Sequence, residues 1–180
     1  PNYPMKISVH LIPIPPPDQP TTSNHDQSPG IIFHYTTGTK LKQIINSGVI
    51  RPSTAQVPPH EKPVVWCSSS CTWEPTATKC PIPGKIGQLI TAKAQAGLAR
   101  IALPATCAPH DLRELSTLAG TSPETCMALL VSGLELGSDP SAWRFSMCPI
   151  PTALFRGIEL FDFASDQWRA INLAELASRN

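Results

Sequence analysis

The chain has 180 residues and a formal net charge of +1. This length fits one domain with a real core, and the near-neutral charge excludes the strong basic field that draws proteins to nucleic acid. No run of residues approaches the ~20 apolar positions of a membrane span. We therefore expect no membrane partner and no nucleic-acid partner.

Proline is over-represented, with 21 residues in the chain, roughly twice the usual share. Residues 5–12, "MKISVHLI", alternate apolar and polar side chains and predict a short strand. The proline-rich residues that follow cannot form a helix and lack several backbone donors. We expect residues 1–30 to form this strand plus a proline-rich arm, which is either a spacer or a P-x-x-P ligand for an aromatic groove. The main domain is predicted to cover residues 31–180.

Six cysteines are present, and none of them form a C-x-x-C pair. Their spacing does not indicate a zinc site, so no metal is expected. Free thiols in a reducing compartment and one or two disulfides both remain open.

The first half of the main domain predicts two strands, each followed by a polar or helical segment. Residues 31–35, "IIFHY", are apolar and rich in strand-forming side chains. Residues 36–48 place their apolar side chains on one helix face, with threonines available as N-caps and a glycine as C-cap. Residues 63–69, "PVVWCSS", predict a second buried strand. Residues 74–79 predict a turn or short helix, because a proline suits the first helical position. Residues 84–95 are compatible with either a strand or a short helix.

The second half alternates strands and helices without a regular βαβ rhythm. Residues 99–104 predict a strand that ends at a proline, and residues 110–120 predict a helix. Residues 122–135 predict another helix, with Ser122 as its cap and Pro123 at its first position. The remaining predicted segments are 142–151, 156–163 and 168–177. This mixture favours the α+β class over a doubly wound sheet.

Two motifs carry a family resemblance. In "FHYTTGTKLKQIINSGVI", residues 33–50, a histidine at a strand end is followed by hydroxyl residues and a helix of the type L..I...G. In "VVWCSSSCTWEPTATK", residues 64–79, an aromatic residue and a serine on a strand precede an alanine-bearing helix. Together they resemble the ADP-ribosyltransferase fold, in its His-Tyr-Glu branch of poly-ADP-ribose polymerases, diphtheria-type toxins and rifampin-modifying enzymes. Trp66 stands in the tyrosine place, Cys67 in the phenylalanine place and Ala77 on the helix.

The resemblance implies split antiparallel β-sheets with flanking helices, and NAD as the substrate. It implies that His34 contacts a ribose, Tyr35 and Thr36 contribute to NAD binding through the strand, Trp66 stacks on the nicotinamide ring and Ser68 meets the carboxamide. Aromatic stacking and a histidine that hydrogen-bonds ribose hydroxyls suit such a ligand. A carboxylate is needed as well, because breaking the nicotinamide–ribose bond develops an oxocarbenium-like charge.

This carboxylate is where the chain departs from the family pattern. The expected glutamate position falls at Met147 or Cys148, and neither is acidic. Glu159 is the nearest glutamate along the chain and is taken as the candidate. The alternatives are that Glu74 substitutes, that the chain acts without a glutamate, or that it binds an NAD-like ligand without turnover. The predicted catalytic residues are His34, Trp66 and Glu159.

The resemblance implies an NAD-dependent ADP-ribosyltransferase, a toxin, effector or phage-defence factor that modifies a macromolecular acceptor, expected to be a protein. Such a protein is expected in the cytoplasm, or delivered into the cytoplasm of a host cell. The alternative is a non-catalytic protein of the same fold, an inhibitor or binding module that acts on a protein partner. Arg51 and Arg100 are candidates for a pyrophosphate contact, because guanidinium groups suit phosphate oxygens. A solvated surface role is equally open for both arginines.

Overall fold

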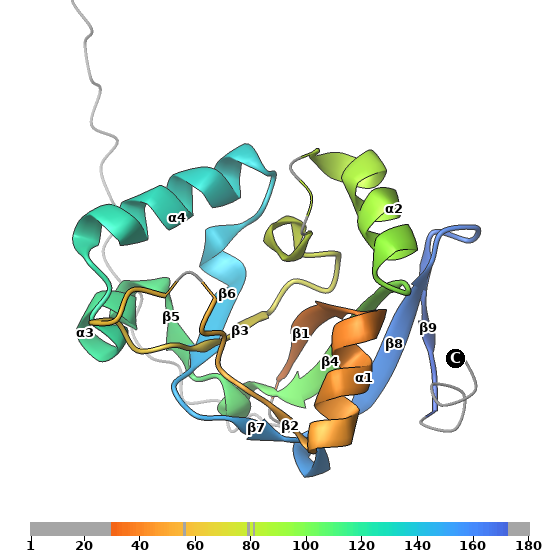
Figure 1. Cartoon of the computed structure of the whole chain (residues 1–180), viewed down its shortest axis with the longest axis horizontal. Coiled ribbons are helices and arrows are strands. Elements are labelled where there is room, and N and C mark those ends of the chain that lie inside the picture. Colours follow the sequence, from red (N-terminus) through yellow and green to blue (C-terminus); the bar gives the residue numbers. More distant parts are fainter. Residues whose placement is uncertain (1–29, 56, 79, 81, 173–180) are drawn as a thin grey trace, which may run out of the picture.

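The computed structural model of the chain describes residues 30–55, 57–78, 80 and 82–172. The strand predicted at residues 5–12, the proline-rich arm and the end of the segment predicted at 168–177 lie outside the described residues. Four α-helices and several short 3-10 turns surround a large antiparallel sheet (Figure 1). The predicted α+β class is therefore confirmed.

The main sheet has seven strands in the order β5-β6-β3-β1-β4-β8-β9. Its strands are β1 (Ile31–Thr37), β3 (Val65–Ser68), β4 (Leu98–Pro104), β5 (His110–Asp111), β6 (Trp143–Ser146), β8 (Gly157–Asp162) and β9 (Gln167–Ala170). A second, two-stranded sheet joins β2 (Val49–Ile50) to β7 (Ile150–Pro151). Neighbouring strands in both sheets pair antiparallel.

The helices are α1 (Gly38–Ser47), α2 (Gly84–Ala94), α3 (Leu115–Ala119) and α4 (Pro123–Glu135). The 3-10 turns are η1 (Pro75–Ala77), η2 (Ala105–Cys107), η3 (Leu112–Glu114), η4 (Pro140–Ala142) and η5 (Thr152–Leu154). Among the described residues, none of these helices is long and apolar enough to cross a lipid bilayer.

Helix α1 begins and ends where its capping residues predict. The Thr37 side chain accepts a hydrogen bond from the backbone N–H of Lys40, and Leu41 is buried against the sheet. Gly48 ends the helix with φ +71°, and its N–H bonds the carbonyls of Ile44 and Ile45. Glycine adopts this left-handed conformation without the steric cost that a Cβ imposes. The predicted C-cap is confirmed.

Three segments of the chain show how far the sequence predicts helices. Residues 84–95, whose sequence is compatible with either a strand or a short helix, form helix α2. Residues 110–120 do not form one helix, because His110 and Asp111 pair with β6 at the sheet edge before η3 and α3 begin. Ser122 caps α4 through the N–H of Thr125, and Pro123 takes its first position, as predicted.

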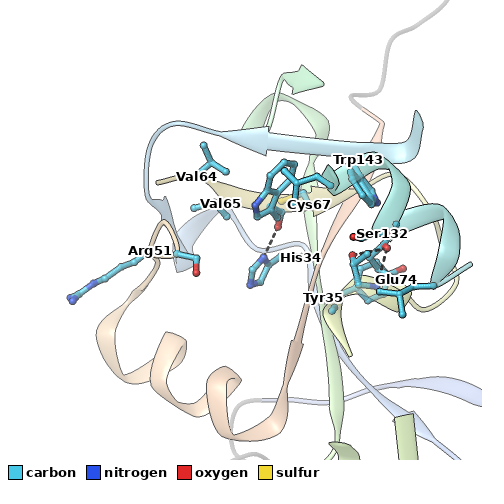
Figure 2. A pocket seen from close by; sticks show the side chains of 16 residues that line it. His34, Tyr35, Arg51, Val64, Val65, Cys67, Glu74, Ser132 and Trp143 are labelled. Carbon is cyan, nitrogen blue, oxygen red and sulfur yellow. Dashed lines mark hydrogen bonds between the residues drawn. The ribbon is translucent and has the colours of Figure 1, made fainter. Parts of the chain in front are cut away.

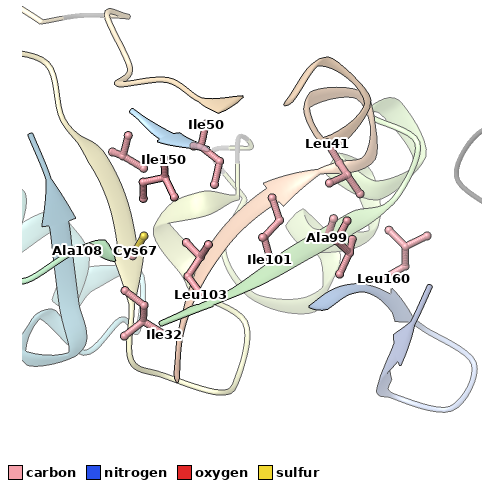
Figure 3. Packing of buried hydrophobic residues seen from close by; sticks show 12 residues of the cluster. Ile32, Leu41, Ile50, Cys67, Ala99, Ile101, Leu103, Ala108, Ile150 and Leu160 are labelled. Carbon is pink, nitrogen blue, oxygen red and sulfur yellow. The ribbon is translucent and has the colours of Figure 1, made fainter. Parts of the chain in front are cut away.

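The two faces of the sheet carry different cores. One face packs apolar side chains against α1 and the β2–β7 sheet, as Figure 3 shows for Ile32, Ile101 and Leu103 with Leu41. The other face gathers aromatic side chains around Tyr35, with Trp73 and Trp168 among them, and it meets α2 through Ala92. Alternation along β1 produces this division, because successive side chains of a strand point to opposite faces.

Candidate functional site

The two strands that carry the family motifs lie side by side at a seam in the sheet. Strand β1 pairs with β4 along its whole length, from Ile31 with Pro104 to Thr37 with Leu98. With β3 it pairs at Phe33 and Ser68. Beyond that pair, the side chain of His34 reaches across, and its Nδ1 lies 2.8 Å from the carbonyl oxygen of Trp66. A side chain thus spans the gap where ladder hydrogen bonds would otherwise hold the strands together.

A pocket of about 430 Å³ opens at this seam. Its walls come from β1, β3, η1 and α4, together with Arg51 and Ser53 beyond β2 (Figure 2). The volume falls in the range of small-molecule sites, which are mostly apolar with a few convergent polar groups. The pocket fits that description, because its lining combines apolar and aromatic side chains with polar groups that include one histidine and one carboxylate.

The hydrogen bond of His34 fixes how its ring is used. A backbone carbonyl oxygen can only accept, so Nδ1 carries the proton and donates to the oxygen of Trp66. In the neutral imidazole the other nitrogen, Nε2, is then an acceptor. His34 is half-buried and lines the pocket. The neutral ring therefore has one nitrogen that donates and one that accepts.

Aromatic rings form part of the wall. Trp66 is half-buried, and its ring packs edge-on against Trp143, with centroids 6.1 Å apart. Its ring is tilted against that of Phe145, with centroids 5.8 Å apart. The indole N–H of Trp143 is buried and, among the described residues, has no hydrogen-bond partner. Packing alone therefore holds the Trp143 ring, and Gly133 of α4 lies directly against it.

Tyr35 lines the pocket with its side chain as well as lending its backbone to β1. Its hydroxyl donates to the carbonyl oxygen of Ser70, 2.6 Å away. Burial raises the pKa of Tyr35 to about 12, against the smaller opposing effect of Arg100. The phenol therefore stays protonated and continues to donate at any physiological pH.

The carboxylate in this pocket belongs to Glu74. It is only 7% exposed and precedes η1, where it caps the turn. Its Oε1 accepts hydrogen bonds from the N–H of Thr76 at 3.3 Å, from Thr76 Oγ1 at 2.9 Å and from the hydroxyl of Ser138. Burying a carboxylate is costly unless hydrogen bonds compensate for the lost water. Three neutral donors provide that compensation here.

Glu159, the sequence candidate for this role, is not brought to the pocket wall. It lies on β8, where its carboxylate accepts a hydrogen bond from Arg100 Nε at 2.5 Å. Arg100 does not line the pocket either, whereas Arg51 does. The carboxylate that lines the pocket is therefore Glu74, which the sequence offers only as an alternative, and not Glu159.

Two other predicted contacts also lie away from the wall. Ser68 is 1% exposed, and its Oγ accepts from the N–H of Ser70 within a tight turn. Thr36 is buried within β1. Neither lines the pocket. Ser68 is paired with Phe33, before the seam opens. Of the predicted site residues, the structure brings together His34, Tyr35 and Trp66.

The positions where the family pattern expects its glutamate also lie outside the pocket lining. Met147 packs against the cluster around Phe145, and Cys148 is exposed. All six cysteines are free thiols in the structure. Within the described residues, no three or more His, Cys, Asp or Glu side chains are grouped so as to hold a metal ion.

Comparison with known proteins gives no match for this chain, whether to a protein-family model, to a curated protein or to a solved structure.

Proposed function

We propose that the pocket at the β1–β3 seam binds the nicotinamide and adjoining ribose of NAD, and that the chain is an ADP-ribosyltransferase that modifies a macromolecular acceptor, of protein nature, in a cytoplasm. The observation that carries the proposal is the convergence of the two quoted motifs on one pocket. His34 and Tyr35 come from the first motif, Trp66 and Glu74 from the second, and all four line the same cavity.

The sheet supports the finer reading of the fold. The resemblance implies two antiparallel sheets that separate beside the NAD site. Here β1 is fully paired with β4 but joins β3 at Phe33 and Ser68. The seam lies inside one seven-stranded sheet, with β5, β6 and β3 on one side and β1, β4, β8 and β9 on the other, and we take it as the place that corresponds to the split.

The lining suits the nicotinamide half of the dinucleotide. Trp66 and Tyr35 offer aromatic surface to a flat ring, and stacking of this kind adds roughly 0.5–1.5 kcal/mol beyond the buried area. His34 Nε2 can accept from a ribose hydroxyl, because Nδ1 is committed to the carbonyl of Trp66. Arg51 is exposed where it lines the pocket, and its guanidinium suits the negative charge of the pyrophosphate.

Glu74 supplies the charge that the reaction needs. When the bond between the ribose C1′ and the nicotinamide nitrogen breaks, its electron pair goes to the ring nitrogen and neutral nicotinamide leaves. The ribose is left with oxocarbenium character, which a nearby carboxylate stabilises in a site of low polarity. An acceptor nucleophile then forms the new bond to C1′ and releases its proton. In this proposal Glu74 takes the role that the sequence assigned to Glu159.

A second function is favoured by a separate observation. Helices α2 and α4 expose many large apolar side chains: Ile86, Leu89 and Ile90 on α2, and Met127, Leu129, Val131 and Leu134 on α4. Exposed apolar surface of this extent is typical of a protein-binding face. A non-catalytic inhibitor or binding module of the same fold would use such a face without turning NAD over.

One assay separates the two functions. The full chain is incubated with labelled NAD, and nicotinamide release is followed separately from label on protein. We expect release by the wild type, a loss of at least ~100-fold in Glu74→Gln, and no change in Glu135→Gln, a matched substitution on the exposed face of α4. No release by the wild type would favour the binding module. Equal release by Glu74→Gln and the wild type would remove Glu74 from the reaction.

A further inference from the structure

The loop that delivers Glu74 to the pocket is tied to the central sheet by two side chains. Residues 69–74 connect β3 to η1. The carbonyl oxygen of Ser70 accepts from Tyr35 Oη at 2.6 Å, and the carbonyl oxygen of Cys71 accepts from Arg100 Nη1. Both carbonyls lie within four residues of Glu74, so these bonds fix the backbone just before the carboxylate.

Arg100 is itself held on several sides. Its Nε donates to Glu159 at 2.5 Å, and its guanidinium carbon lies 4.3 Å from the ring centre of Phe33 and 4.5 Å from that of Trp168. The residue is only 8% exposed. A planar guanidinium can stack between aromatic rings while its separate N–H groups donate in fixed directions. Arg100 thus has one orientation, in which it joins Glu159 to the loop.

The strand register places these residues in one row. Tyr35 of β1 faces Arg100 of β4, and Arg100 faces Glu159 of β8. Side chains directly opposite one another on adjacent strands share a face of the sheet. Along this row, Glu159 of β8 orients Arg100 of β4, and Arg100 and Tyr35 each donate a hydrogen bond to the loop.

We propose that Arg100, oriented by Glu159, is a positioning residue that holds the 69–74 loop so that Glu74 faces the pocket. The inference rests on the proposed function for the role of Glu74. Glu159 then acts through Arg100 and does not touch the substrate. Without the Arg100 donor, the carbonyl of Cys71 loses a charge-assisted hydrogen bond. Without Glu159, a buried guanidinium loses its counter-charge.

Hydrogen exchange on the full chain, without ligand, tests the clamp directly. Arg100→Lys keeps the charge but loses the fork that reaches Glu159 and Cys71 together, and Glu159→Gln keeps the shape but removes the counter-charge. We expect amides of residues 69–78 to exchange about 10- to 100-fold faster in Arg100→Lys and to a smaller extent in Glu159→Gln. Amides of β4 and β8 keep their wild-type rates.

The matched control is Arg144→Lys. Arg144 also donates to backbone carbonyls, those of Ser141 and Trp143, but not to this loop. It should leave exchange at residues 69–78 unchanged. Unchanged loop exchange in both Arg100→Lys and Glu159→Gln would overturn the clamp, as would faster exchange spread evenly over the whole sheet.

Kinetics of nicotinamide release give the second readout. A misplaced Glu74 lowers kcat by about 10- to 100-fold, while KM for NAD changes by less than about threefold, because the aromatic wall still binds the ring. A loosened loop with wild-type kcat would overturn the positioning role. A lowered kcat in Glu159→Gln with unchanged loop exchange would overturn it too, and would return Glu159 to the substrate. If the wild type releases no nicotinamide, the proposed function fails, while hydrogen exchange still decides whether the clamp exists.

Discussion

The imidazole Nδ1 of His34 donates a hydrogen bond to the carbonyl oxygen of Trp66, a residue 32 positions further along the chain, at 2.8 Å. This bond joins the two motifs at the point where β1 and β3 separate. It orients the ring whose Nε2 we propose as the acceptor of a ribose hydroxyl, so in the proposed function one side chain both spans the seam and contacts the ligand.

Replacing His34 by alanine separates these two tasks. The apo protein should lose about 1 kcal/mol of unfolding free energy, because one hydrogen bond across the seam is removed. The increase in Tm that NAD gives the wild type should disappear. Urea denaturation and thermal unfolding with and without NAD measure the two effects. His60→Ala, an exposed histidine outside the pocket, serves as the control. An NAD-induced increase in Tm that survives in His34→Ala would exclude the histidine from the site.

Gly133 is predicted to be essential for the aromatic wall. A Cβ at this position would lie 2.5 Å from Cη2 of Trp143. Gly133→Ala therefore forces the indole to move, and overpacking of this kind costs roughly 1–3 kcal/mol. The displaced ring also narrows the pocket, so NAD binding should weaken. Val131→Ala, an exposed position of the same helix, tests for general effects on α4. Equal stability of Gly133→Ala and the wild type would show that the Trp143 ring has room to shift.

Alkaline pH should destabilise the fold through two buried groups. Burial raises the pKa of Cys67 from 9.0 to about 12 and that of Tyr35 from 10.0 to about 12. The folded state therefore holds these protons more tightly than the unfolded chain does. The stabilisation that these two groups contribute is complete below pH 9 and is lost as the pH rises toward 12. Where a group has lost its proton in the unfolded chain but keeps it in the folded protein, the free energy of unfolding falls by about 1.4 kcal/mol per pH unit.

Urea denaturation at pH 8, 9.5 and 10.5 checks this prediction. Cys67→Ala and Tyr35→Phe should each flatten the decline, since each removes one of the titrating groups. Stability that stays constant up to pH 10.5 would contradict the assigned burial of both groups.

Local sequence signals predicted the elements whose boundaries are set by neighbouring residues. Helix α1 could be placed because Thr37 and Gly48 cap it, and α4 because Ser122 and Pro123 begin it. Helix α2 could not be separated from a strand, although Ile86, Leu89 and Ile90 follow a helical spacing, because two glycines lower its helix propensity and no side chain caps its start.

The carboxylate of the site could not be chosen from the sequence, because long-range contacts decide it. Glu74 is held by Ser138, 64 positions away, and Glu159 is engaged by Arg100, 59 positions away. The family pattern directed attention to the late strands, whereas the sole local signal for Glu74 was its place before Pro75, where an acidic residue caps a turn. His34 and Trp66, which both line the pocket, could be selected from the sequence because each lies inside a motif.

The most direct test of the account is calorimetric titration of NAD into the wild type and into Ser132→Trp. Ser132 is exposed on α4 and lines the pocket, so a tryptophan there fills the cavity without entering the core. We predict that the wild type binds NAD in the micromolar-to-millimolar range, and that Ser132→Trp remains folded and shows no binding heat. Absence of binding by the wild type, or equal binding by both proteins, would contradict the assignment of this pocket to NAD.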